Sequence, residues 1–302
     1  MLKLNIETRE IIDNVVMKYH IFDVNQPIMI TFPPVCQSIQ NIDAATNAPV
    51  WSFDYFANRK LNIIAFNHIG EGNYFDSAIF ISYLDTLKHA IAIFPSKVGY
   101  GTSLGGFALS LHADRLGLDK ALLMMPQSTY CKSIAPWDPI VVNAQDSKVS
   151  DMTTLDGKGC KTPLTVIYDP LSIADRLHVK RYEQALTTLK IYAVGHRVPR
   201  ALQHLNMLSD VILQFRLGSI DQDSFYRGLR GRRNLSYYFR DAIKKPNNSY
   251  TNKRIAIIYW HKTKQTITHF KFEPSKISER ITTSCHKRIM KIKLKLQKIL
   301  SR

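Results

Sequence analysis

Residues 97–110 read KVGYGTSLGGFALS, and this stretch decides the fold. Its first five residues form a short, mostly apolar run that predicts a buried β-strand, and the apolar residues of 104–116 recur at helical spacing. Between them, residues 101–105 form the pattern G-x-S-x-G around Ser103. A serine at this place lies on a tight, strained turn that needs glycine on both sides. The stretch therefore predicts a strand, a sharp turn carrying a hydroxyl, and a helix packed closely on the sheet.

Five more apolar runs lie upstream and downstream, at 27–32, 61–66, 120–125, 163–168 and 189–194. They are continuous and often β-branched, as strands buried on both faces are. Helical patterns at 74–90, 104–116 and 176–187 alternate with them. Because strands that alternate with helices form parallel crossover units, the sequence predicts the α/β class, with a mostly parallel open sheet and helices on both faces.

The chain has 302 residues, of which 45% are apolar, which is enough for one large core and an appendage. After residue 194 the pattern becomes helical, and toward the end it becomes strongly basic. We expect a core domain over 1–217, containing a lid or a surface insertion over 126–162, and a basic, mainly helical region over 218–302.

Ser103 is the candidate nucleophile. A serine hydroxyl is reactive at neutral pH only when a base contacts it and a carboxylate orients that base. On this topology the partners follow the serine in the order acid, histidine, each after a later strand. His196 comes just after the run 189–194, and we therefore predict that it is the base.

Two carboxylates follow the run 163–168: Asp169 directly at its end and Asp175 further on. Asp175 lies just before a helix that we expect to begin near Leu177, where a loop carboxylate can reach across to a histidine. Asp169 is placed to cap or brace the loop instead. We favour Asp175 as the acid and keep Asp169 as the alternative.

The helix after Ser103 should also serve the reaction. Its amino-terminal N–H groups and the positive end of its dipole point at the serine oxygen, where an oxyanion would form. The backbone N–H of Leu104 is the first donor that we expect to stabilise that oxyanion.

These residues, in this order and on these strands, resemble the α/β-hydrolase superfamily over residues 25–215. The phrases YGTSLGGFA (100–108), MMPQS (124–128) and YDPLSIADRLH (168–178) are similar to a bacterial group of hydrolase-like proteins, some encoded with surface-polysaccharide genes. The resemblance implies acyl or ester chemistry at Ser103. As the substrate of such chemistry we expect an ester or a thioester, either a small ester or an acylated glycan.

The second oxyanion donor departs from the superfamily's pattern. There it comes from a loop after an early strand, often rich in glycine, but here the run 27–32 is followed by Pro33 and Pro34, which have no N–H. Val35 carries the first N–H after that run. The alternative is the loop after 61–66, where His68 is a candidate for binding the substrate.

Cysteine usage and hydropathy exclude several classes of protein. Cys36, Cys131, Cys160 and Cys285 are far apart and form no C-x-x-C pair, which argues against a zinc site and a disulfide framework. A serine mechanism needs no metal and no organic cofactor, and we expect none. The amino terminus lacks a secretory signal, and no run reaches the roughly 18 apolar residues of a membrane span. We expect a cytoplasmic protein, with peripheral membrane attachment as the alternative.

Positive charge is concentrated near the end of the chain. Residues 1–226 carry 20 Lys or Arg and 21 Asp or Glu, whereas residues 227–302 carry 21 and 3. A region of this kind suits an anionic membrane surface or an acidic polymer. Nucleic acid is a less suitable partner, because no zinc, RNP-type or basic-zipper signature accompanies the charge.

Two functions follow from the sequence. The first is a serine hydrolase or acyltransferase that works through Ser103, His196 and either Asp175 or Asp169. The second is an interaction protein with the same fold and an idle triad, whose basic C-terminus docks on an anionic membrane, a partner enzyme or an acidic polymer.

Overall fold

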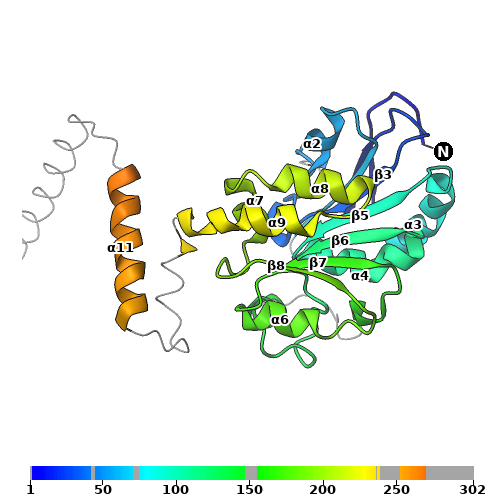
Figure 1. Ribbon diagram of the computed structural model, residues 1–302. Helices are drawn as coiled ribbons and strands as arrows, with labels where there is room; N and C mark the ends of the chain where they lie inside the picture. The colour runs from blue at the N-terminus through cyan, green and yellow to red at the C-terminus, as the bar shows by residue number, and fades with distance from the viewer. Residues whose placement is uncertain are drawn as a thin grey trace, which may run out of the picture. The chain divides into compact units, whose positions relative to one another are not determined.

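The structure is a computed structural model that describes residues 2–41, 45–70, 75–146, 155–235, 237–238 and 252–269. The chain divides into two compact units, residues 1–244 and residues 245–302. The first unit contains the β-sheet and the helices that cover it (Figure 1). Of the second unit, the helix α11 (Asn252–His269) is described.

The first unit is built on an eight-stranded sheet. In spatial order its strands are β1 (Thr8–Ile12), β2 (Val15–His20), β4 (Ile63–His68), β3 (Ile28–Phe32), β5 (Lys97–Thr102), β6 (Lys120–Met124), β7 (Leu164–Tyr168) and β8 (Thr187–Lys190). All neighbours from β4 to β8 are parallel, and β2 is antiparallel to both β1 and β4. The predicted α/β class with a mostly parallel sheet is confirmed.

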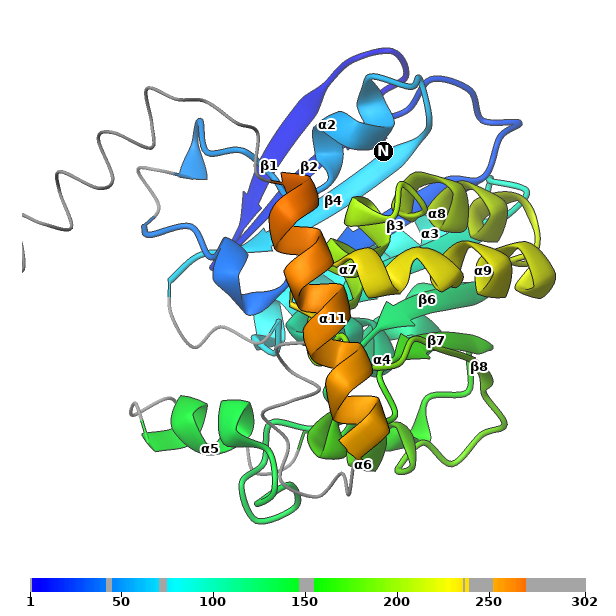
Figure 2. The same cartoon turned by 60° about the vertical axis from the view of Figure 1, so that its left-hand side comes forward.

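The hairpin of β1 and β2 is an addition to the predicted strands. It lies along β4 at the edge of the sheet (Figure 2). Its residues 8–20 mix Thr, Arg, Glu, Asp and Lys with apolar residues, so they form no continuous apolar run. β1 at the edge is mostly half-buried, whereas β2 is buried on both faces but has an apolar run of only three residues, 15–17.

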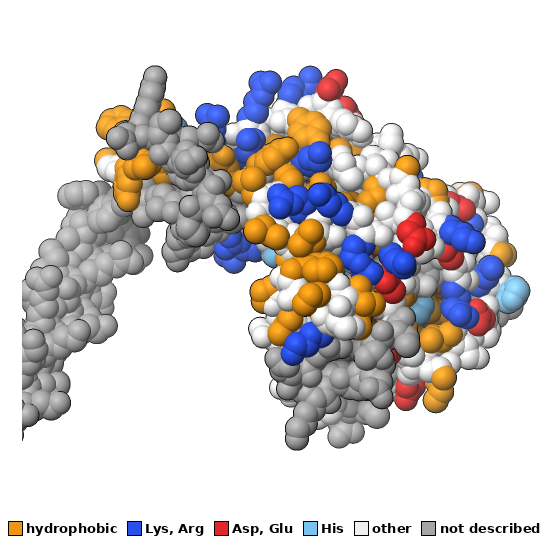
Figure 3. Space-filling view, turned by 90° about the horizontal axis from the view of Figure 1, so that it is seen from below, with side chains coloured by type: hydrophobic (Ala, Val, Ile, Leu, Met, Phe, Trp, Pro, Cys, Tyr) orange, Lys and Arg blue, Asp and Glu red, His pale blue; other side chains and the backbone are white. Residues whose placement is uncertain are grey.

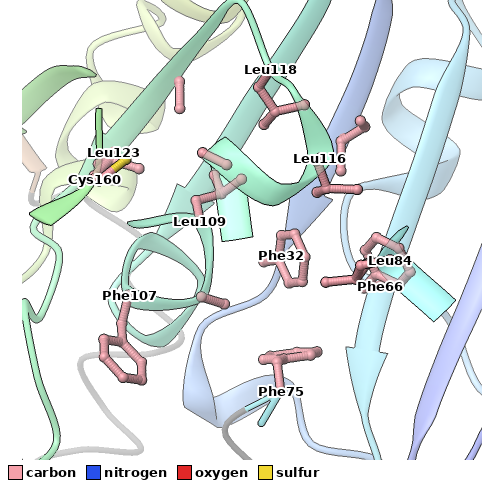
Figure 4. Packing of buried hydrophobic residues seen from close by; sticks show 14 of the residues in the cluster. Phe32, Phe66, Phe75, Leu84, Phe107, Leu109, Leu116, Leu118, Leu123 and Cys160 are labelled. Atoms are coloured by element: carbon pink, nitrogen blue, oxygen red, sulfur yellow. The ribbon is translucent and has the colours of Figure 1, made fainter. Parts of the chain in front are cut away.

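Helices cover both faces of the sheet, as expected. On one face α3 (Ala78–Ile91) and α4 (Leu104–Leu116) pack on the strands, and Figure 4 shows Phe66 of the sheet beside Leu84 of α3. The other face carries α2 (Phe53–Ala57), α7 (Val198–His204), α8 (Leu208–Leu217) and α9 (Gln222–Gly228). Burial of these two apolar layers is the main stabilising term of the fold.

The last strand is shorter than predicted. β8 ends at Lys190, so residues 191–194 of the apolar run leave the sheet. Ile191 and Val194 are nevertheless fully buried, because they pack in the layer that contains α7 and α8. Positive φ angles at Ala193 and Gly195 turn the chain in this segment. Residues 191–194 are apolar because helices cover them, and not because they belong to a strand.

The helix after β7 also differs from the expectation over 176–187. It is α6 (Ile173–Val179), which begins earlier and is shorter, and residue 187 already belongs to β8. Asp175 therefore lies inside the first turn of α6 and not in a loop before a helix that begins near Leu177.

The insertion at 126–162 contains α5 (Pro139–Asp146) and the short 3-10 helix η2 (Gly157–Gly159). An isolated bridge joins Thr129 to Asp156 at its two ends. Residues 147–154 of this insertion lie outside the described residues.

The compact unit extends past the boundary expected at residue 217. Ile220, Phe225 and Leu229 are buried in the same layer as α7 and α8, and Leu229 begins the 3-10 helix η3 (Leu229–Asn234). The predicted basic region thus starts within the first unit. Its lysine-rich end, residues 270–302, lies outside the described residues.

On the face that Figure 3 shows, Lys and Arg side chains are interspersed with acidic and apolar ones. This distribution agrees with the near balance of 20 basic and 21 acidic residues over 1–226. In the described part of the chain, no helix has both the length and the apolar character that crossing a bilayer requires.

Candidate active site

Ser103 lies on a strained turn between β5, which ends at Thr102, and α4, which begins at Leu104. Its backbone angles are φ 52° and ψ −116°. A non-glycine residue with such angles costs about 1–3 kcal/mol, and the strain is kept only where the surrounding structure enforces it. The turn directs the side chain away from both the strand and the helix, and the residue is 4% exposed.

The glycines that flank Ser103 are required by close backbone approach. A Cβ on Gly101 would run into the backbone of Gly105, and a Cβ on Gly105 would run into the carbonyl of Phe32 at the end of β3. A Cβ on Gly106 would come within 2.7 Å of the Pro126 side chain. The G-x-S-x-G pattern therefore lets β5, α4 and the loop after β3 meet at one point.

The structure brings Ser103, His196 and Asp175 into one chain of hydrogen bonds. Ser103 Oγ lies 2.9 Å from Nε2 of His196, and Nδ1 of His196 lies 2.7 Å from Oδ1 of Asp175. The carboxylate of Asp175 is nearly buried, whereas the His196 side chain is 26% exposed. An imidazole held in this way accepts the serine proton on one nitrogen while the other donates to the carboxylate.

Asp169 does not take part in that chain of hydrogen bonds. It is fully buried, and its carboxylate accepts from the backbone N–H groups of Leu171, Val194 and Gly195 at 2.9, 2.8 and 2.6 Å. Of the two alternatives, Asp175 contacts His196, and Asp169 braces the loop that carries His196.

The two predicted backbone donors lie on adjoining segments. Leu104 is the first residue of α4, and Val35 begins the 3-10 helix η1 (Val35–Gln37) in the loop that presses against Gly105. Among the described residues, no hydrogen bond takes up the N–H of Leu104 or that of Val35. Both N–H groups are therefore without a hydrogen-bond partner in the part of the chain that the structure describes.

His68 lies at the end of β4 and hydrogen-bonds the backbone of Val35. It is 1% exposed, and burial lowers the pKa of its imidazole to about 4, although the contact with Val35 opposes this shift. A neutral, buried imidazole with this partner supports the loop that carries Val35. Its Nδ1 has no hydrogen-bond partner among the described residues.

Gln127 is a site residue that the sequence analysis missed. It follows β6, is 1% exposed, and its side-chain oxygen lies 3.1 Å from Ser103 Oγ and 3.3 Å from the hydroxyl of Tyr130. Ser103, Gln127, Asp175 and His196 thus follow the carboxyl ends of four neighbouring strands. Since such ends meet at one edge of a parallel sheet, a polar residue after the run 120–125 was a usable signal.

In the described part of the chain, His, Cys, Asp and Glu side chains form no group that could hold a metal ion. The free cysteines Cys131 and Cys160 are buried, and Cys36 is exposed.

Comparison with solved structures finds many similar folds at low identity. The capsule O-acetyltransferase of Neisseria meningitidis serogroup A is 12% identical over 68% of this chain and 93% of its own, with a TM-score of 0.47. Esterase 2 of Thermogutta terrifontis is 11% identical over 76% and 93%, with a TM-score of 0.44. An alpha-beta serine hydrolase homologue from Coxiella burnetii is 10% identical over 70% and 99%, with a TM-score of 0.40. No protein-family model and no curated protein matches the sequence.

The fold itself is identified by its own geometry. The sheet is parallel except for β1 and β2, and a strained serine joins the central strand β5 to the helix behind it. The carboxylate and the histidine that contact this serine follow it in the chain in the order Asp175, His196. This combination of a nucleophile turn and a partner order gives the chain the α/β-hydrolase fold.

Proposed function

We propose that the protein is a serine hydrolase or acyltransferase that acts on an ester or thioester. Ser103 is the nucleophile, His196 the general base and acid, and Asp175 the carboxylate that orients the imidazole. The observation that carries the proposal is the unbroken chain from Asp175 Oδ1 to His196 Nδ1 and from His196 Nε2 to Ser103 Oγ, at 2.7 and 2.9 Å.

In the first half of the proposed reaction, Ser103 Oγ attacks the carbonyl carbon while its proton passes to Nε2 of His196. The tetrahedral intermediate collapses, the bond to the leaving oxygen or sulfur breaks, and His196 returns the proton to that atom. An acyl group remains on Ser103. Asp175 stabilises the imidazolium that exists between these two transfers, because its carboxylate lies against Nδ1.

The N–H groups of Leu104 and Val35 are proposed as the donors to the oxyanion. Neither is used within the described residues, and the segments that carry them adjoin at Gly105. His68 holds the Val35 loop through its backbone contact. One such donor contributes on the order of 10²–10³-fold in kcat in serine hydrolases.

In the second half, a hydroxyl attacks the acyl-enzyme with His196 as base. Water gives a carboxylic acid, and a sugar hydroxyl gives a new ester. We extend the proposal to an acyl group carried on a glycan, and this part rests on the sequence phrases at 100–108, 124–128 and 168–178 alone.

The experiment that tests the proposal is turnover of p-nitrophenyl acetate and of an acetyl thioester by the full chain. Ser103→Ala should abolish turnover. The matched control is Ser110→Ala, which removes a buried serine on the same helix that bonds the Phe107 carbonyl, and it should keep the wild-type rate. Adding a monosaccharide and detecting its acylated form by mass spectrometry distinguishes the transferase from the hydrolase. A folded wild-type protein that turns over neither ester would overturn the proposal.

A second candidate function concerns α11. We propose that this helix docks on an anionic membrane surface, with no requirement for an active triad. Trp260 and Tyr259 are 69% and 54% exposed, and Ile255 and Ile267 are exposed as well. Residues 245–302 carry 15 Lys or Arg and 2 Asp or Glu. Exposed aromatic and aliphatic side chains among cations are typical of helices that lie in a bilayer interface.

Sedimentation with liposomes tests this candidate. The full chain should pellet with vesicles of phosphatidylcholine and phosphatidylserine but not with phosphatidylcholine alone, and Trp260→Ser with Tyr259→Ser should weaken pelleting. Leu217→Ser is the matched control, because Leu217 is an exposed apolar residue of the first unit. Equal pelleting with both vesicle types, or by the double variant and the wild type, would exclude anionic-membrane docking through α11 and leave a protein or polymer partner.

A further inference from the structure

We propose that Ser128, His178 and Asp138 are positioning residues that hold the helix carrying Asp175 at a fixed distance from the nucleophile turn. The proposal rests on the proposed function, because it assigns these residues to the hydrolase reaction at Ser103. They do not touch the reacting atoms, and they act through Asp175.

The three residues form a second chain of hydrogen bonds inside the protein. Nε2 of His178 lies 2.9 Å from Oδ2 of Asp138, and Nδ1 of His178 lies 3.1 Å from the backbone nitrogen and 2.9 Å from Oγ of Ser128. The exposed fractions of His178, Asp138 and Ser128 are 1%, 2% and 0%. Polar groups buried this deeply are held in one geometry by their partners.

The partners also fix where the His178 proton lies. A backbone N–H can only donate, so Nδ1 of His178 accepts from Ser128, and the ring proton is on Nε2. That proton points at the carboxylate of Asp138, which also accepts from the backbone N–H of Ile140 at 2.9 Å. His178 is therefore satisfied as a neutral ring.

This second set has the residue types of a catalytic triad but cannot act as one. Ser128 is fully buried, and its Oγ already accepts from the guanidinium of Arg181 at 2.7 Å. Arg181 also forms an ion pair with Asp156, a residue of the insertion over 126–162. A substrate carbonyl cannot reach this hydroxyl, so the role of the set must be internal.

The position of the set relative to the candidate active site gives that role. His178 is on α6, one turn after Asp175, and both residues are buried. Ser128 follows Gln127, whose side chain contacts Ser103 Oγ at 3.1 Å. The contacts thus close a ring that runs from Ser103 through Gln127, Ser128, α6 and His196 back to Ser103.

Because the ring is closed, the separation of the nucleophile turn and α6 is fixed on two sides. One side is the triad itself, and the other passes through Ser128 and His178. Without the second side, the hydrogen-bonded link between α6 and the nucleophile turn runs through Asp175 and His196. A misplacement of about 1 Å in such a group can cost up to about 100-fold in rate.

Asp138 holds the imidazole of His178 in place as an ionised carboxylate. Burial alone would raise its pKa, but the hydrogen bonds from His178 and from the Ile140 N–H hold the pKa below its usual range.

The test is a double-mutant cycle on ester turnover by the full chain. His178→Gln keeps a donor toward Asp138 and removes the ring nitrogen Nδ1 that accepts from Ser128. It should lower kcat by about 10- to 100-fold with KM unchanged. In an Asp175→Asn background the same change should cost less than about twofold, because coupled residues are not additive. Asp138→Asn keeps one oxygen as an acceptor and removes the charge, so it should lower kcat, by less than His178→Gln does.

His112→Gln is the matched control, since His112 is a buried histidine of α4 that bonds the Phe75 carbonyl at 2.7 Å, and it should leave kcat unchanged. If His178→Gln does not fold, Ser128→Ala replaces it with a smaller expected loss of kcat. An unchanged kcat, or an equal loss in both backgrounds, would overturn the positioning role.

A readout without turnover separates this inference from the proposed function. The imidazole proton between His196 and Asp175 should give a downfield proton NMR signal, which His178→Gln should shift or broaden and His112→Gln should not. If the wild type turns over no ester, the proposed function fails. If the NMR signal of His178→Gln equals that of the wild type, the positioning inference fails whatever the activity.

Discussion

The carboxylate of Asp169 accepts a hydrogen bond of 2.6 Å from the backbone N–H of Gly195, the residue directly before His196. A second bond comes from the N–H of Val194 at 2.8 Å. The loop that carries the imidazole is therefore fastened to the end of β7 by one aspartate, while another aspartate, Asp175, contacts the ring. The two carboxylates divide support of the backbone and orientation of the side chain between them.

This division predicts opposite effects for two similar substitutions. Asp175→Asn should lower kcat by about 10³–10⁴-fold with little change in stability, because it disturbs the proton arrangement on His196. Asp169→Asn should lower the free energy of unfolding by about 1–3 kcal/mol, because backbone N–H groups lose a charged acceptor. Urea unfolding and ester kinetics on both variants check this, and the division is wrong if the two variants lose activity and stability in the same proportion.

The backbone strain at Ser103 predicts a stabilised but inactive variant. Ser103→Gly should have a free energy of unfolding roughly 1 kcal/mol higher than that of Ser103→Ala. The reason is that glycine adopts φ 52° without strain and alanine does not. Both variants should lack esterase activity. Because both variants lack the hydroxyl, the difference between their thermal unfolding midpoints measures the backbone strain alone. Equal midpoints would show that the turn is not strained.

The close contact at Gly105 predicts a large loss of stability in a small substitution. Gly105→Ala places a methyl group against the carbonyl of Phe32, where backbone cannot yield, and it should lower the free energy of unfolding by several kcal/mol or prevent folding. Gly159→Ala is the control, because a Cβ there meets no atom within 4 Å. Comparable unfolding midpoints for the two variants would contradict the packing described at the turn.

Two buried histidines predict how stability depends on pH. His68 and His112 have pKa values of about 4 in the folded protein, against 6.5 for the free group, chiefly because burial penalises the charged ring. Between pH 6.5 and 4 the unfolded chain takes up protons that the folded protein does not. The free energy of unfolding is therefore highest above pH 6.5 and falls by about 1.4 kcal/mol per pH unit for each histidine.

Chemical unfolding at pH 7 and pH 5 measures this effect. His112→Gln should lose about 2 kcal/mol less than the wild type between those two values, because it removes one of the two linked protons. If the free energy of unfolding of His112→Gln changes with pH as much as that of the wild type, folding does not lower the pKa of His112.

The sequence located Ser103, Asp175 and His196 because each one follows a strand. The glycines around Ser103 report backbone contacts that no larger residue permits, so the nucleophile turn is readable without coordinates. Asp175 and His196 were predicted because a carboxylate and then a histidine follow later strands of the sheet. The choice between Asp169 and Asp175 depended on the loop, and the reading of Asp169 as a brace came from its place at the strand end.

The parts that sequence reasoning missed depend on three-dimensional contact. Ile191 and Val194 read as strand because burial under α7 and α8 makes a segment as apolar as burial in a sheet. His178 carried no pattern of its own, and Gln127 carried only its place after the run 120–125. Their partners Ser128 and Ser103 come from other segments of the chain. The hairpin of β1 and β2 was missed because polar residues between 8 and 20 interrupt its apolar residues, although β2 is buried.

The central claim is that Ser103 is an activated nucleophile, and covalent labelling tests it most directly. The folded full chain is incubated with a fluorophosphonate, and the adduct is counted by intact mass and located by peptide mapping. We predict one adduct per chain, on Ser103, that is absent from His196→Ala and retained in Ser110→Ala. Folded wild-type protein that remains unlabelled, or that carries the adduct on another residue, would contradict the account.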